Sequence, residues 1–152
     1  MGQTLVLGVG NLIMSDDGFG IHVIRRLEET VSLPEEVQVL DGGTAGLDLL
    51  YYLEGLKRLI IIDAVEMQKP AGTLTRMVND EIPAYLSIKM SPHDVGLSDM
   101  LFAAKLRDLH PEEVIVLGVQ PGYVDMGLEL SPEVLVQVDV VVGKIQEELA
   151  KP

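Results

Sequence analysis

The sequence contains no cysteine, so disulfide bonds, thiolate metal ligands and thiol nucleophiles are all excluded. Any metal ion held by this chain must therefore be bound by imidazole and carboxylate groups. Long hydrophobic runs are also missing, because aliphatic stretches such as Leu59 to Ile62 are far shorter than the ~20 residues of a membrane span. We see no basic segment followed by an apolar stretch, the pattern of a secretory signal, and therefore expect no such signal. We therefore expect a soluble, cytoplasmic protein.

Basic residues are scarce. The 152 residues include 11 Lys and Arg against 24 Asp and Glu, which gives a net charge of −13. Such a surface repels a phosphate backbone, so nucleic acid is excluded as a partner, whereas a protein, a peptide or a cation fits. The length and a hydrophobic content of 47% predict one domain over residues 1–152 with a full core.

Four apolar segments, bounded by glycine or other turn residues, have the composition of strands: residues 4–9, 37–40, 59–62 and 114–119. Helical patterns between them indicate crossovers, and this alternation favours a mostly parallel sheet. Residues 73–78 also have strand composition, but they follow the third strand too closely for a helical crossover, so we expect an antiparallel edge strand. The predicted fold is three-layer α/β, with a twisted five-stranded sheet and helices on both faces.

Caps and apolar spacing place the helices. Ser15 is expected to cap a first helix that ends before Pro34, and Ser131-Pro132-Glu133 is a strong start for the last one. The residues expected on the buried faces of these two helices are Phe19, Val23, Ile24 and Leu27, then Val134, Val138, Val141, Ile145 and Leu149. Shorter helical patterns occur at 47–53 and 97–109, with an irregular segment at 79–90.

The glycine turn after the first strand resembles part of a dinucleotide fingerprint. Gly8 and Gly10 fit that pattern, and Asp41 stands where a ribose-binding acid would, but the third glycine is replaced by Ile13. Asp16 and Asp17 would also bring negative charge to the helix end that a pyrophosphate needs. A nucleotide site and a purely structural turn both remain open.

Acidic side chains stand where predicted strands end. Asp16 and Asp17 follow the glycine turn, and Asp63 directly follows the third strand. Sites in open α/β sheets lie outside the carboxyl ends of the strands, where the strand order reverses. Structural roles are the alternative, because acids in a first helical turn stabilise the helix by roughly 0.3–1 kcal/mol and a carboxylate after a strand can cap the next turn.

Of the three histidines, His22 and His110 fit structural positions, whereas His93 lies in a polar Ser-Pro-His-Asp loop where a ligand or general base is often held. Asp17, Asp63 and His93 together supply two carboxylates and one imidazole, which suits a divalent ion such as nickel or zinc. Three ligands and an open position would also serve hydrolysis, because metal-bound water becomes nucleophilic near neutral pH.

Taken together, the motifs resemble those of the nickel–iron hydrogenase maturation endopeptidases over essentially the whole chain. The matching segments are Gly8-Val9-Gly10-Asn11, Asp16-Asp17-Gly18, Asp41-Gly42-Gly43-Thr44-Ala45-Gly46, Asp63-Ala64 and Ser91-Pro92-His93. The resemblance implies a peptidase that removes a short C-terminal extension from the hydrogenase large-subunit precursor after nickel insertion. It also implies that Asp17, Asp63 and His93 contact that nickel. Many members carry glutamate where this chain has Asp17, so Asp16 is a reserve ligand.

The resemblance leads to a mechanistic hypothesis. The enzyme owns no cofactor; nickel carried by the substrate, which cadmium or zinc could mimic, serves as the recognition handle. Asp17 or Asp63 then activates water, as expected of an aspartyl-type endopeptidase. The turn formed by Asp41, Gly42, Gly43 and Thr44 lets the substrate backbone approach closely. We expect a monomer whose partner is the nickel-loaded precursor.

Two rival functions stay open at the level of sequence. A stand-alone zinc peptidase could use the same three ligands, and metal analysis of the purified protein would reveal stoichiometric zinc. A non-enzymatic nickel or nucleotide carrier would bind its ligand tightly and shorten no precursor.

Overall fold

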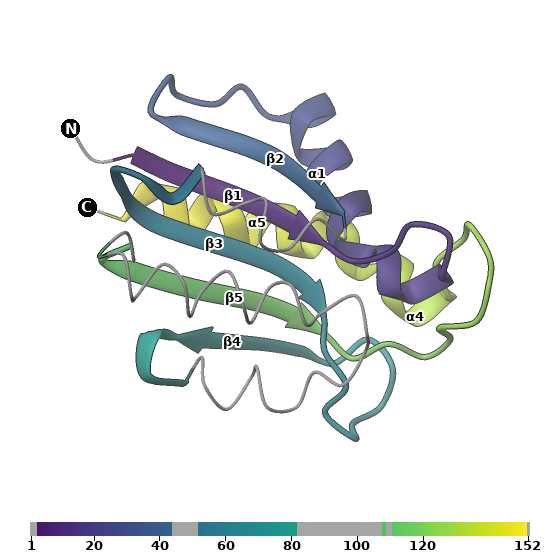
Figure 1. The fold of residues 1–152 in the computed structure, drawn as a ribbon. Helices are drawn as coiled ribbons and strands as arrows, with labels where there is room; N and C mark the ends of the chain where they lie inside the picture. The colour runs from purple at the N-terminus through teal and green to yellow at the C-terminus, as the bar shows by residue number, and fades with distance from the viewer. Residues whose placement is uncertain (1–2, 44–51, 82–107, 109–110, 152) are drawn as a thin grey trace.

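The computed structural model describes residues 3–43, 52–81, 108 and 111–151. Strands and helices alternate along most of this part of the chain (Figure 1). The elements are β1 (Gln3–Val9), η1 (Ser15–Gly18, a 3-10 helix), α1 (Phe19–Thr30), β2 (Val37–Gly43), β3 (Leu56–Ala64), β4 (Leu74–Val78), η3 (Asn79–Glu81, 3-10), β5 (Glu113–Val119), α4 (Pro132–Leu135) and α5 (Gln137–Ala150).

The five strands form one sheet in the order β2-β1-β3-β5-β4. β1 pairs in parallel with β2 and β3, and β3 pairs in parallel with β5. β4 is antiparallel to β5 and lies at the edge, as the short connection from β3 predicted. The chain leaves β1 for β2 on one side and later returns to β3 on the other, so the strand order reverses between β1 and β3. The predicted mostly parallel α/β fold is confirmed.

Both faces of the sheet are buried. On one face Val6, Ile60 and Ile115 pack with α1 and α5 in a common core. On the other face Leu7 and Ile61 belong to a second buried cluster, with Leu5, Val9, Leu53, Leu59, Val65, Val114 and Val116. Burial on two sides explains why these strands consist of unbroken aliphatic runs rather than alternating polar and apolar residues.

Helices α1 and α5 lie side by side on the same face of the sheet (Figure 1). The predicted apolar residues of α1 are all fully buried, as expected for side chains that recur every 3.6 residues on one face of a helix. The predicted stripe of the last helix is buried from Val134 to Ile145, and Leu149 packs against its edge. That helix is divided into α4 and α5 at Val136, a break that the apolar spacing did not predict.

Two strands are longer than expected. β2 continues through Asp41 to Gly43, and β3 begins at Leu56 and ends at Ala64, so Asp63 lies inside the strand rather than after it. Neighbouring strands extend these ends: Asp63 pairs with Gly118 of β5, and Gly43 pairs with Val9 of β1.

Several predictions fall on residues outside the described part. These are the helix at 97–109 except for Asp108, the helix at 47–53 except for Tyr52 and Leu53, most of the segment 79–90, and the loop 91–94. Leu53 itself is fully buried. Among the helices of the described residues, none is long and apolar enough to cross a membrane. The single domain over residues 1–152 stays a prediction.

Candidate functional site

The candidate site lies at the carboxyl ends of β1 and β3, where the strand order reverses. The turn after β1 leads into η1, and η1 packs against β3. Gly10 at this turn has a positive φ of 129°, and any Cβ there would collide with the carbonyl oxygen of Asp17. Glycine is therefore required for η1 to fold back onto the end of β1.

Ser15 does not cap a helix as predicted, and that prediction is wrong. Its φ is 51°, it lies within η1, and its Oγ donates a hydrogen bond to the carbonyl oxygen of Asp125 at 2.7 Å. Its backbone N–H donates to Gly127, and α1 starts only at Phe19. The hydroxyl and the backbone N–H of Ser15 thus form long-range hydrogen bonds to Asp125 and Gly127, and the hydroxyl does not cap the helix.

Asp17 is held against the turn after β1. Its side chain Oδ2 accepts a 2.9 Å hydrogen bond from the backbone N–H of Asn11, and 8% of the residue is exposed. The carboxylate thus stays within reach of the rim formed by the ends of β1 and β3, while a small part of the residue meets solvent.

Asp16, the neighbour of Asp17, is fully buried and holds the loop between β5 and α4. Its Oδ2 accepts hydrogen bonds from the backbone N–H groups of Gly122 (2.8 Å) and Tyr123 (2.9 Å) and from Ser131 Oγ (2.7 Å). Its Oδ1 accepts one from the Ser131 N–H at 2.7 Å. Four donors on one carboxylate support a structural role for this reserve ligand.

The electrostatics of Asp16 follow from these bonds. Burial alone raises the pKa of its carboxyl, but the hydrogen bonds from Ser131, Gly122 and Tyr123 outweigh burial and bring the pKa below its ordinary value. Asp16 is therefore a permanent anion at neutral pH. The sequence pattern missed this clamp, because Ser131 was expected to cap α4, whereas no side-chain cap bond forms there.

Asp63 is fully buried near the carboxyl end of β3. In the alternation of the strand it falls on the same face as Ile61, away from α1. α1 and η1 approach the same strand end closely, since a Cβ on Gly20 would collide with the carbonyl oxygen of Ile62. The structure therefore brings the segments that carry Asp17 and Asp63 to one rim of the sheet.

His93 and Thr44 lie outside the described residues, so their positions relative to this rim stay predictions. Among the residues described, no group of three His, Cys, Asp or Glu side chains could hold a metal ion. The predicted set of Asp17, Asp63 and His93 is not tested by that finding, because its imidazole is outside the search.

Asp41 is exposed beside the glycine turn. With Gly43 it borders a hollow of about 170 Å³, whose other lining residues are Gly10, Asn11, Leu12 and Ile21. The N–H of Gly10 donates a 3.0 Å hydrogen bond to the carbonyl oxygen of Gly43, so the ends of β1 and β2 are tied together next to Asp17. Asp41 and Gly43 thus lie beside the turn that follows β1. The role of residues 41–44 in substrate approach stays a prediction.

The same turn argues against a nucleotide site. The space at Gly10 that a pyrophosphate would need is filled by the backbone of Asp17. Asp16 and Asp17 are buried ahead of α1, where the helix end would otherwise attract an anion. Ile13, at the position of the third glycine in the nucleotide pattern, is 51% exposed.

His22 is half-buried on α1. Its Nε2 is buried and has no hydrogen-bond partner in the described part of the chain. Burial, and secondarily the charge of Arg25, lower the pKa of this imidazole, so it is neutral at pH 7. His110 lies outside the described residues.

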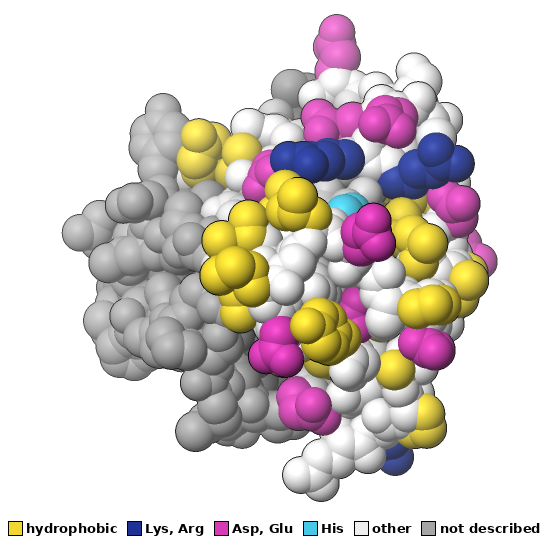
Figure 2. Space-filling view, turned by 90° about the vertical axis from the view of Figure 1, so that its right-hand side faces the viewer, with side chains coloured by type: hydrophobic (Ala, Val, Ile, Leu, Met, Phe, Trp, Pro, Cys, Tyr) yellow, Lys and Arg dark blue, Asp and Glu magenta, His cyan; other side chains and the backbone are white. Residues whose placement is uncertain are grey.

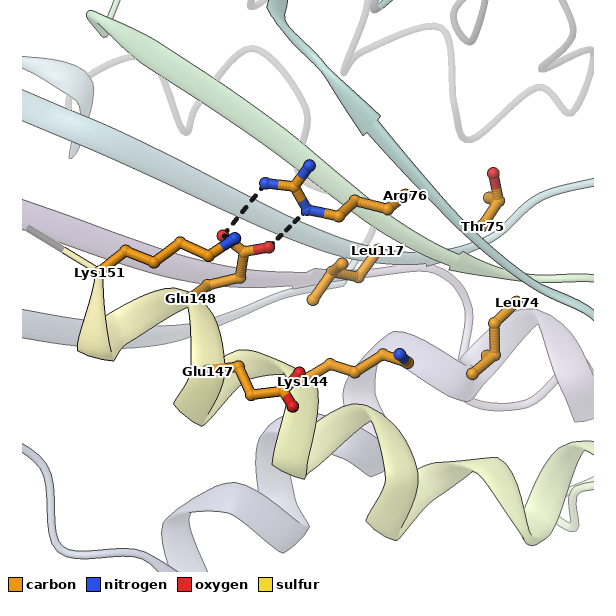
Figure 3. A pocket seen from close by; sticks show the side chains of 8 residues that line it. All are labelled: Leu74, Thr75, Arg76, Leu117, Lys144, Glu147, Glu148 and Lys151. Carbon is orange, nitrogen blue, oxygen red and sulfur yellow. Dashed lines mark hydrogen bonds and ion pairs between the residues drawn. The ribbon is translucent and has the colours of Figure 1, made fainter.

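A second hollow, of about 510 Å³, lies between β4 and the end of α5 (Figure 3). Glu148 projects into it from α5 and bonds with Arg76 of β4 and Lys151. Arg58 of β3 also donates to the backbone carbonyl of Glu148 at 2.6 Å. The hollow runs along the β4 edge of the sheet on the α5 side. Its lining residue Thr75 pairs with Gly118 near the carboxyl end of β5, whereas Glu148 lies near the end of α5, beside the start of β1 (Figure 1).

Comparison with known proteins agrees with this geometry. The family model described as "HycI: Hydrogenase maturation protease" matches residues 21–148. The chain is 40% identical to the hydrogenase expression/formation protein HupD of Rhodobacter capsulatus, over 97% of this chain and 71% of that one. It is 37% identical to the hydrogenase 2 maturation protease of Escherichia coli, over 90% and 84%. The solved hydrogenase maturating endopeptidase HybD from E. coli superposes with a TM-score of 0.92 at 34% identity, covering 97% of this chain and 91% of that one.

Proposed function

The chain belongs to the hydrogenase maturation protease family and is a peptidase, and on that basis we propose that it removes the C-terminal extension of a nickel–iron hydrogenase large-subunit precursor after nickel insertion. The observation that supports the proposal is the contact between η1, which carries Asp17, and β3, which carries Asp63, where the strand order reverses. This reversal point is where open α/β sheets place their sites.

In this proposal the nickel is part of the substrate. Asp17, Asp63 and His93 contact the ion that the precursor already holds, and this contact brings the scissile peptide bond to the rim. Carboxylate and imidazole donors suit a borderline divalent ion. A carboxylate of Asp17 or Asp63 then accepts a proton from the attacking water, as an aspartyl-type endopeptidase would.

The turn after β2 provides the approach path. Asp41 is exposed and stands beside the hollow next to the Asn11 backbone that binds Asp17. Gly42 and Gly43 lack side chains, so an extended substrate segment can pass close to this edge on its way to the rim.

The setting of the reaction follows from the same proposal. A chain of net charge −13 repels nucleic acid and fits a cationic or metal-bearing protein partner. We expect a monomer acting in the cytoplasm on newly made precursor.

The experiment measures precursor cleavage by the mass shift of the large subunit, with and without bound nickel. Asp17→Asn, Asp63→Asn and His93→Ala are each expected to lower the cleavage rate of nickel-loaded precursor at least 100-fold, because a lost general base or ligand costs about 10²–10⁴. Glu28→Gln, which changes an exposed carboxylate on α1 away from the site, is the control and is expected to stay within a few-fold of wild type.

Three results would contradict the proposal. One is near-normal processing by all three variants. Another is equal cleavage of nickel-free and nickel-loaded precursor by the wild-type enzyme. The third is stoichiometric zinc in the purified protein together with loss of activity on chelation, since this would indicate a peptidase that owns its metal.

A further inference from the structure

Large apolar side chains are exposed next to the candidate site. We call the five residues Ile13, Tyr123, Val124, Met126 and Leu128 the apolar rim. Met126 is 78% exposed and Leu128 is 65% exposed, values unusual for side chains of this size in a cluster. Figure 2 views the end of the molecule that lies at the right of Figure 1, and hydrophobic side chains spread across it.

The apolar rim is fixed to the segment that carries Asp17. The backbone N–H of Gly127 donates to the carbonyl oxygen of Ile13 at 2.8 Å, and the N–H of Ser15 donates to Gly127 at 2.9 Å. Asp16 holds the start of the same loop through Tyr123. A partner bound to the apolar rim would therefore be held in a fixed position relative to the candidate site.

The two segments that form the apolar rim carry acidic residues and no basic ones. Residues 111–143 contain no Lys, Arg or His, and their charged residues are Glu112, Glu113, Asp125, Glu129, Glu133 and Asp139. Residues 3–21 likewise contain no basic residue. Figure 2 shows acidic side chains among the hydrophobic ones over most of this face, with Lys and Arg side chains in its upper part. The complementary surface is apolar and bordered by Lys and Arg.

We propose that the apolar rim docks the folded body of the large-subunit precursor, at an apolar patch bordered by basic residues and separate from the scissile segment. This inference rests on the proposed function and adds the surface that selects the client. A second copy of this chain fits the apolar rim poorly, because the acidic residues beside the two apolar rims would face each other.

Docking at a distance from the scissile bond is the same in the ground state and the transition state. Such uniform binding lowers KM and leaves kcat unchanged. Substitutions in the apolar rim should therefore raise KM, whereas substitutions of Asp17 and Asp63 should lower kcat.

The test compares steady-state cleavage of nickel-loaded precursor by variants. Met126→Gln/Leu128→Gln is expected to raise KM about tenfold with kcat within about twofold. Glu129→Lys is expected to raise KM several-fold and to weaken its dependence on salt. Two matched controls should keep wild-type KM: Val140→Gln, an exposed apolar residue on α5 outside the rim, and Glu28→Lys, the same charge change far along α1.

The outcomes separate this inference from the proposed function. Absence of cleavage by the wild-type enzyme contradicts the function itself. Wild-type cleavage with unchanged KM in Met126→Gln/Leu128→Gln, or an equal rise in Val140→Gln, overturns the docking surface alone. A wild-type dimer in gel filtration that the same double variant converts to monomer also overturns it, since a second copy would then occupy the rim. Thermal unfolding at the wild-type temperature shows that the exposed substitutions leave the fold intact.

Discussion

Asp16 and Asp17 are adjacent in the chain but have different surroundings. The Asp16 carboxylate accepts four hydrogen bonds from the loop between β5 and α4. The Asp17 carboxylate instead turns to the backbone N–H of Asn11 at the end of β1. Within a 3-10 helix, successive side chains point in different directions, so a pair of acids can bind a loop with one member and serve a site with the other.

Replacing Asp16 by Asn should therefore damage stability. The amide offers one acceptor where four donors converge, and its NH₂ faces other donors. We expect the free energy of unfolding to fall by about 3 kcal/mol, because hydrogen bonds to a buried charge contribute about 1.5–3 kcal/mol each and are not additive. Chemical denaturation measures the change. Ser131→Ala, which removes a single one of these bonds, should cost less; equal costs would contradict the clamp.

The same clamp sets an acid limit. The folded-state pKa of Asp16 lies below its unfolded value, so its contribution is present above about pH 4 and is lost as the pH falls through the folded pKa. The stability difference between wild type and Asp16→Asn should therefore shrink as the pH falls below the unfolded-state pKa of about 4. A difference that stays constant as the pH is lowered from 7 to well below 4 would show that the charge is not responsible.

At the residue scale, local patterns put Asp63 near the carboxyl end of β3, although it lies inside the strand rather than after it, and they put Asp17 in the helical turn that follows the glycine turn, which is η1. The role of either residue at the site stays a prediction. Local patterns could not separate Asp16 from Asp17, since the partners of Asp16 are more than 100 residues away. The role of Ser131 was missed for the same reason. His93 stays a prediction, because it lies outside the described residues.

At the element scale, the candidate site depends on how closely α1 approaches the sheet. Gly20, in the first turn of α1, leaves no room for a side chain beside the carbonyl oxygens of Ile62 and Val9. Backbone atoms of two paired strands cannot move aside as a flexible side chain would. The position of η1, and with it Asp17, is thus set by this contact between helix and sheet.

Gly20→Ala should consequently lower the free energy of unfolding by about 3 kcal/mol through overpacking against backbone. Gly143→Ala on α5 is the matched control, because nothing lies within 4 Å of the added methyl group. The control is expected to stabilise the protein by about 1 kcal/mol through helix propensity. Thermal and urea unfolding of both variants decide the point, and a stable Gly20→Ala protein would contradict the tight approach.

Element types were predicted well and element ends were not. The apolar runs of β1, β3 and β5 and the spacing of α1 are strong local patterns. The extra length of β2 and β3 comes from pairing with neighbouring strands, which no local pattern reveals. Ser15 failed as a cap because its backbone and hydroxyl bond to residues 125–127, a tertiary effect that overrides the local preference.

At the scale of the whole molecule, the two ends of the sheet differ. One end holds the acidic candidate site and the apolar rim. The other holds Glu148, 4% exposed, with Arg58, Arg76 and Lys151 around it, joining β3, β4 and α5 (Figure 3). We regard this second cluster as a structural junction, since its ions bond to one another.

Glu148→Gln should reduce stability and spare catalysis. Arg58 and Arg76 would lose their shared anion, and we expect a cost of about 2 kcal/mol, reduced from the usual cost of breaking a buried pair because Arg76 is half-exposed. Although burial raises the pKa of Glu148, its bonds to Arg76 and Lys151 bring it below the ordinary value, so this stabilisation is lost below about pH 4. Lys151→Ala, at the exposed edge, should change little. A fall in kcat for Glu148→Gln would contradict the division between the two ends.

The most direct test of the account is the position of a divalent ion in crystals soaked with nickel or cadmium, located by anomalous scattering. One ion is expected at the rim between β1 and β3, coordinated directly by donor atoms of Asp17, Asp63 and His93. Carboxylates of Asp17 and Asp63 too far apart to share an ion, or an ion bound only elsewhere, would contradict it.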